Sequence, residues 1–181
     1  LAEFLDKQAN GYEPPKLQRK ALVQGHCHHK AIMRMNSEEN ILTKMGLDHE
    51  MPDFGCCGMG GSFGFERGEQ YEASVKIGER ELLPAIRNTP AETLVIADGF
   101  ICREQISQRT DRHALHLAQV MQMALHEKSG DPPRAYPERD YLTRPANHRL
   151  PAALLLSSGL LLAGWLIGKS KTINKALEEH E

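Results

Sequence analysis

Short apolar runs that alternate with helical patterns constrain this chain's fold most. The clearest run covers residues 93–97 and a second covers 21–25, and the mostly polar residues 47–51 are expected to form a further short strand. Between these runs, apolar residues recur at helical spacing in 28–45 and again in 71–87. Such alternation is typical of βαβ units. We therefore expect an α/β fold with a short parallel sheet and flanking helices.

Composition divides the chain into four zones. Residues 1–128 have the mixed pattern of a globular domain, and 129–149 form a polar linker rich in proline. Residues 150–168 contain no charged residue, which predicts a hydrophobic helix, and 169–181 form a charged tail.

The hydrophobic segment 150–168 is long enough to cross a membrane. As a helix it would reach roughly 28 Å, close to the ~30 Å thickness of a hydrocarbon core. Trp165 lies near one end and basic residues flank both sides, which suits anchoring at the two interfaces. We expect a C-terminal membrane anchor. A helix packed on another domain or on a partner is the alternative, because serine, glycine and proline dilute the apolar character.

Charge and composition narrow the classes of partner. The 22 basic and 24 acidic residues leave a net charge of −2, which gives no electrostatic reason to expect a nucleic acid. The chain starts at Leu1, and residues 1–12 have no secretory signal. We expect the C-terminal piece of a longer, cytoplasmic protein, kept in a reducing compartment.

All four cysteines follow predicted strands. Cys27 follows the first strand, Cys56 and Cys57 follow the weak one, and Cys102 follows the clearest one. Parallel strands linked by right-handed crossovers end at one edge of a sheet, where such folds bind ligands. We therefore predict a four-thiolate site for an iron–sulfur cluster, with [4Fe–4S] favoured and zinc as the alternative. Ordinary buried cysteines are the simplest competing interpretation.

A glycine-rich loop surrounds the cysteine pair. Glycine lets backbone approach a bulky inorganic group and expose N–H donors to sulfur, so we expect Gly58, Gly60 and Gly61 close to the centre. His28 is expected there too, because imidazole can ligate metal or donate to sulfur. The loop does not fit G-x-G-x-x-G, which disfavours a dinucleotide site.

The other histidines are interpreted more plainly. His26 and His29 are taken as loop and surface residues, and His113 and His116 as solvent-exposed residues. Arg103 after the last cysteine fits either a docking contact or a helix start.

Three segments of the chain resemble the cysteine-rich CCG domain. That domain occurs in heterodisulfide reductase, in the iron–sulfur subunit of glycolate oxidase, and in fused FAD-linked D-2-hydroxyacid dehydrogenases, which oxidise D-lactate or D-2-hydroxyglutarate and look most similar. The resemblance covers roughly residues 20–125. It is carried by His26-Cys27-His28, by Gly55-Cys56-Cys57-Gly58-Met59-Gly60-Gly61-Ser62-Phe63-Gly64, and by Asp98-Gly99-Phe100-Ile101-Cys102-Arg103-Glu104-Gln105-Ile106.

The resemblance implies an electron-transfer part of an oxidoreductase that is not catalytic alone. FAD would lie in a missing domain or in a separate dehydrogenase subunit, and the centre would pass its electrons to an acceptor such as a membrane quinone. The family pattern ends in Cys-x-x-Cys, whereas this chain has Gly99 in place of the first of those cysteines. Four ligands remain, so a four-thiolate cluster and zinc both stay open. The alternative functions are a structural zinc module of a multi-subunit complex and a thiol-reactive redox domain.

Overall fold

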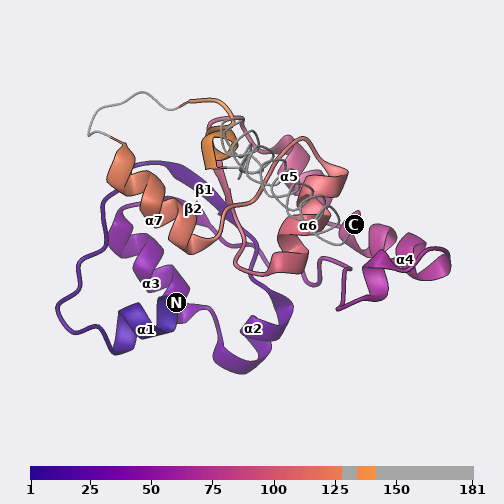
Figure 1. Ribbon diagram of the computed structural model, residues 1–181, viewed down its shortest axis with the longest axis horizontal. Coiled ribbons are helices and arrows are strands. Elements are labelled where there is room, and N and C mark those ends of the chain that lie inside the picture. The colour runs from indigo at the N-terminus through magenta and orange to yellow at the C-terminus, as the bar shows by residue number, and fades with distance from the viewer. Residues whose placement is uncertain (128–133, 142–181) are drawn as a thin grey trace, which may run out of the picture. The chain divides into compact units, whose positions relative to one another are not determined.

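Three short parallel strands form the centre of the fold (Figure 1). In this computed structural model, which describes residues 1–127 and 134–141, the strands are β1 (Lys20–Val23), β2 (Asp48–Glu50) and β3 (Leu94–Ile96). Their order is β2-β1-β3, so β1 pairs with both neighbours. Leu22 lies opposite Glu50 on one side and Val95 on the other. The predicted α/β class and parallel sheet are confirmed.

The helices are shorter and more numerous than the sequence predicted. The helix expected over 28–45, for which a break at Asn36-Ser37 was the alternative, is interrupted slightly earlier, after Met33, where Arg34 has a left-handed φ of 61°. The helix expected over 71–87 is likewise split into two. The described helices are α1 (Ala2–Lys7), α2 (Cys27–Met33), α3 (Asn36–Met45), α4 (Glu69–Gly78), α5 (Leu82–Asn88), α6 (Phe100–Arg109) and α7 (Leu117–His126), with short 3₁₀ turns at η1 (Phe63–Phe65) and η2 (Pro137–Tyr141).

Helices cover both faces of the sheet, because side chains alternate along each strand. One face of β1 and β3 packs with α1, α3 and α7. The opposite face carries Leu22 and Val95 and packs with α5 and α6. Two of the four cysteines, Cys57 and Cys102, belong to this second core cluster. The candidate site is thus anchored in the core on that face.

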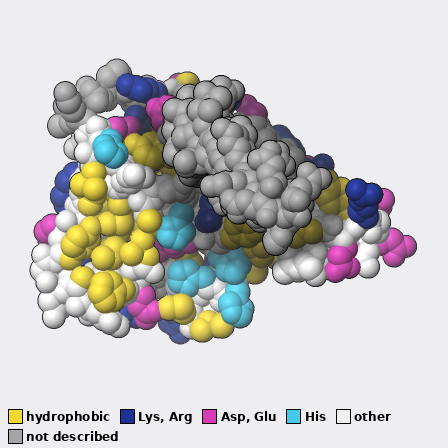
Figure 2. Space-filling view, in the orientation of Figure 1, with side chains coloured by type: hydrophobic (Ala, Val, Ile, Leu, Met, Phe, Trp, Pro, Cys, Tyr) yellow, Lys and Arg dark blue, Asp and Glu magenta, His cyan; other side chains and the backbone are white. Residues whose placement is uncertain are grey.

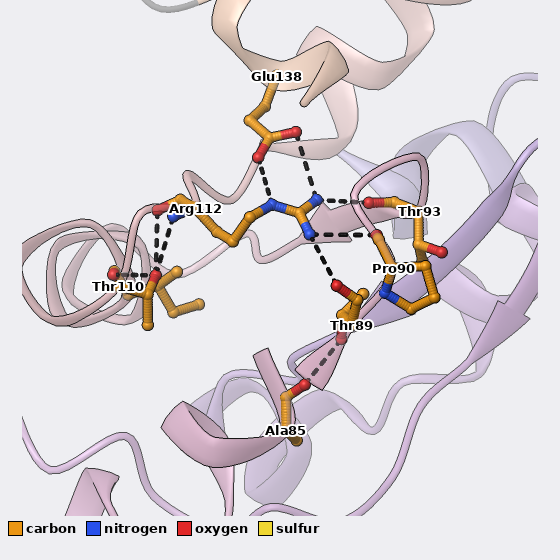
Figure 3. A network of polar contacts seen from close by, with 8 residues as sticks. Ala85, Thr89, Pro90, Thr93, Thr110, Arg112 and Glu138 are labelled. Carbon is orange, nitrogen blue, oxygen red and sulfur yellow. Dashed lines mark hydrogen bonds and ion pairs between the residues drawn. The ribbon is translucent and has the colours of Figure 1, made fainter. Parts of the chain in front are cut away.

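Residues 134–141, which the sequence analysis placed in the linker, pack against the globular part. Glu138 is fully buried, and its carboxylate accepts a 2.6 Å bond from Nε of buried Arg112. The same guanidinium donates to the backbone carbonyl of Thr93 at 2.6 Å, and Figure 3 shows it between Glu138 and the 89–93 turn. This network joins η2 to the segment that leads into β3.

We predict that Glu138→Gln destabilises the protein by about 3 kcal/mol, because it leaves the Arg112 charge buried without its counter-charge. Chemical denaturation followed by circular dichroism measures this. Glu3→Gln is the matched control, since Glu3 forms an exposed ion pair with Lys7, and it should leave stability unchanged. Equal effects of the two substitutions would contradict the assignment of Arg112–Glu138 as a buried structural pair.

The C-terminal predictions fall outside the described residues. This holds for the hydrophobic helix expected over 150–168 and for the charged tail over 169–181. No helix within 1–127 and 134–141 has the length and apolar character needed to cross a membrane.

Candidate cysteine centre

The four cysteines lie beyond the carboxyl ends of the three strands. Cys27 is the first residue of α2, which follows β1, and Cys102 lies in the first turn of α6, which follows β3. Cys56 and Cys57 lie in the loop that follows β2. Because the strands are parallel and adjacent, these three connections leave the sheet at one edge.

The structure brings the four sulfurs together as two neighbouring pairs. Sγ of Cys27 lies 4.0 Å from Sγ of Cys56, which is too far for a disulfide, and all four cysteines are free. The thiol of Cys102 faces the sulfur of Cys57.

The two pairs differ in exposure. Cys57 and Cys102, the inner pair, are each 1% exposed, whereas Cys56 is exposed and Cys27 is half-buried. We call Cys27 and Cys56 the outer pair. One side of the site is therefore fixed in the core, and the other side faces solvent.

Protonation is unequal within the inner pair. A hydrogen bond from the Cys102 thiol lowers the pKa of Cys57 to about 7, and the backbone N–H of Met59 helps despite burial. The same interaction, together with burial, raises the pKa of Cys102. In the outer pair, burial raises the pKa of Cys56, partly offset by the N–H of Gly58, which donates to its sulfur at 3.4 Å. Within the inner pair, the thiolate form is therefore favoured at Cys57 over Cys102.

Polar contacts tie the α2 side of the site to the cysteine loop. Gln24, which is 1% exposed at the end of β1, donates from its amide to the carbonyls of Gly25 at 3.1 Å and Gly55 at 3.4 Å. Lys30 on α2 forms a 2.6 Å ion pair with Asp53, whose carboxylate also accepts from the N–H of Gly55. These contacts set the separation between Cys27 and the loop that carries Cys56.

On the α6 side, Arg103 shapes the turn that precedes Cys102. Its guanidinium donates to the carbonyls of Ala97 at 3.0 Å and Asp98 at 2.7 Å. The Asp98 carboxylate in turn accepts from the N–H of Leu117 at the start of α7. Arg103 therefore has a structural role in the fold, since its guanidinium is bonded to two backbone carbonyls. The docking contact suggested as one interpretation is not needed to explain this residue.

Gly58 packs closely against α4. A Cβ at this position would overlap the backbone carbonyl of Ser74, and the φ of Gly58 is +97°. Ser74 is fully buried, and its carbonyl also accepts from the amide of Gln105 on α6. By contrast, a Cβ at Gly60 or Gly61 would meet no atom within 4 Å. Only Gly58 of the three predicted glycines is in close contact with its surroundings.

We predict that Gly58→Ala destabilises the chain by about 3 kcal/mol, since it adds a backbone penalty at positive φ to a steric overlap. Thermal unfolding of the metal-free chain measures this. Gly60→Ala is the matched control in the same loop and should change the unfolding temperature little. Similar losses for both variants would show that the loop does not depend on contact with Ser74.

The histidines are arranged differently from the prediction. Figure 2 shows histidine side chains gathered on the face that carries α2. His28 is exposed, whereas His26 is half-buried beside Gly99 and Cys102. The two rings meet edge to face, with centroids 6.3 Å apart, and burial lowers the pKa of His26. Of the two rings, that of His26 lies beside Gly99 and Cys102.

His113 and His116, which were expected to be solvent-exposed, are both half-buried. His116 caps α7, because its Nδ1 accepts from the N–H of Ala118 at 3.0 Å. Nδ1 of His113 is buried without a hydrogen-bond partner. His116 thus has a local structural role that the sequence analysis did not identify.

The donor set fits an iron–sulfur cluster by its chemistry. Four free thiols, glycine backbone and N–H donors directed at sulfur are the groups that hold and tune such clusters. In the part of the chain that the structure describes, no group of three or more His, Cys, Asp or Glu side chains is arranged to hold a metal ion. A hollow of about 500 Å³ lies by the opposite ends of the strands, beside Lys20, Asp48 and Thr93, away from the cysteines.

Sequence reasoning missed four supporting side chains: Gln24, Lys30, Ser74 and Arg103. The role of Gln24 could have been predicted, because a polar residue directly after a buried strand is expected to need hydrogen-bond partners. The roles of Lys30 and Arg103 depend on backbone geometry, and a single sequence does not show them.

Comparison with known proteins gives one distant similarity. No family model matches the chain, and no solved structure matches it. Over 101 residues, 55% of this chain, it is 30% identical to a D-2-hydroxyglutarate dehydrogenase of Pseudomonas putida. The matched part is 10% of that protein, so the chain spans about a tenth of the relative's length. The similarity supports a distant link to that dehydrogenase.

Proposed function

We propose that the chain is an iron–sulfur electron-transfer module of an FAD-linked oxidoreductase that acts on a 2-hydroxy acid. The observation that carries this proposal is the placement of four free thiols in the connections that leave one edge of the parallel sheet, with the sulfurs of Cys27 and Cys56 4.0 Å apart. Similarity to a D-2-hydroxyglutarate dehydrogenase supports the oxidoreductase class. FAD would belong to the dehydrogenase domain or subunit with which this module works.

Cys27, Cys56, Cys57 and Cys102 would hold the cluster, which supplies a one-electron carrier when bound. The inner pair is held by core packing, so its sulfurs keep their positions. The outer pair faces solvent, which leaves it free to adjust to a bulky group. The N–H of Gly58 stabilises negative charge on the sulfur of Cys56.

Exposed apolar side chains adjoin the two helices that carry Cys27 and Cys102. Ile32 and Met33 end α2 with 67% and 49% of their surface exposed, and Phe100 begins α6 with 61% exposed. Such side chains suit docking of a partner beside the outer pair. We propose the flavin domain as the donor. A quinone is the proposed acceptor, reached through a cytoplasmic membrane anchor over 150–168.

Zinc is the second candidate because one distance favours it. Two thiolates that bind one tetrahedral zinc at about 2.3 Å lie about 3.8 Å apart, and the outer sulfurs lie 4.0 Å apart. In that case the chain would be a structural module of a larger complex.

The deciding experiment is anaerobic purification of the full chain, with analysis of iron, sulfide and zinc and with EPR after reduction. We predict iron and sulfide in equal amounts and a reducible signal, which Cys57→Ser removes because it deletes one of the four proposed ligands. Ser62→Ala, in the same loop but exposed, should keep both. One zinc per chain with no redox signal would refute the electron-transfer proposal.

A further inference from the structure

The ring of His26 occupies the space that a side chain at position 99 would need. A Cβ built on Gly99 would lie 2.7 Å from Cδ2 of His26, 3.0 Å from its Cγ and 3.2 Å from Sγ of Cys102. The imidazole and the Cys102 sulfur thus both border one point beside Gly99. This is the position at which the resembling motif would have a fifth cysteine.

The backbone holds His26 in place from two sides. His26 is the N-cap of α2, directly before Cys27, with extended φ and ψ of −63° and 124°. Its carbonyl accepts from the N–H of Lys30 at 2.9 Å, so the first turn of α2 fixes the residue. Gly99 is in turn the N-cap of α6, the helix that carries Cys102. The ring therefore lies where the two cysteine-bearing helices begin.

Polar atoms of the ring are available for a bound group. Within the described residues, the His26 ring makes no hydrogen bond to protein, and the one aromatic contact found for it is with His28. A neutral imidazole carries one N–H donor. Because the carbon Cδ2 of the half-buried ring and Sγ of Cys102 border the same point beside Gly99, an N–H of this ring is suited to donate to the sulfur of a bound cluster.

We infer that His26 is the fifth residue of the centre: its ring contacts the bound cluster and donates an N–H to sulfur there, and Gly99 is required to admit it. The inference rests on the proposed function, because it concerns a bound cluster. Hydrogen bonds to sulfur stabilise the more negative, reduced state. His26 is accordingly a positioning and tuning residue that raises the midpoint potential.

Pulsed EPR on the full, reduced chain with ¹⁵N-labelled histidine tests this contact. We expect a histidine nitrogen coupling to the cluster that His26→Ala removes, with a shift of the midpoint potential to lower values in a redox titration. His28→Ala is the matched control, an exposed imidazole two residues along, and should keep both the coupling and the potential.

Gly99→Ala provides a second, independent variant. It removes no donor, but its methyl group would take the space of the imidazole. We expect Gly99→Ala to lose the histidine coupling and to lower the midpoint potential, as His26→Ala does. A general destabilisation of the fold would not produce both effects.

The outcomes separate the two proposals. A cluster without histidine coupling, or one whose coupling survives His26→Ala or is lost in His28→Ala, overturns the inference and leaves the electron-transfer function standing. Absence of iron from the wild-type chain overturns both. If His26→Ala does not assemble a cluster, the wild-type coupling together with His28→Ala and Gly99→Ala still decides the question.

Discussion

The parallel pairing of β1 with both neighbours is the constraint on which the site depends. The register aligns Val23 of β1 with Ile96 of β3, and Leu22 with Glu50 of β2. Each strand then leaves the sheet in the same direction, and each of the three connections delivers at least one cysteine. An antiparallel partner for β1 would send its loop to the opposite edge. Cysteines that are far apart in the sequence are therefore brought to the same edge of the sheet by the strand topology.

Core packing divides the site into a fixed part and an adjustable part. The inner pair shares its cluster of buried residues with α5 and α6, so displacement of Cys57 or Cys102 would open the core. The outer pair is held by polar contacts at the surface, such as the ion pair between Lys30 and Asp53. This division suits a redox centre, because a rigid side limits rearrangement and an exposed side allows exchange of electrons with a partner.

β1 and β3 could be predicted because they are buried apolar runs between polar segments, whereas β2 consists of the polar residues Asp48–Glu50 and was only weakly indicated. The sequence also predicted that each cysteine follows a strand, and in a parallel sheet this is enough to place the cysteines at one edge. It indicated a helix start at Arg103 as one of two interpretations but not the extent of α6, since Gln105 interrupts the apolar periodicity and its amide binds the distant carbonyl of Ser74. The inclusion of η2 in the globular part was missed for a similar reason, because burial of Glu138 depends on Arg112.

Side-chain placement at the site is what a single sequence predicts least well. His26 and His28 flank the same cysteine, and only the start of α2 decides which of them turns inward. Glu38 lies in the first turn of α3, where an acidic residue is expected to face solvent. It is 1% exposed, and burial together with the charge of Asp98 raises its pKa to about 8.

The central claim, that four cysteines form one centre, is tested most directly by thiol alkylation and mass spectrometry of each cysteine with and without bound iron. In the metal-free chain, Cys56 and Cys27 should react first, because the inner pair is buried. After iron and sulfide are bound, we expect all four thiols to become protected together. Continued reaction of Cys27 and Cys56 in the iron-loaded chain would contradict a shared centre.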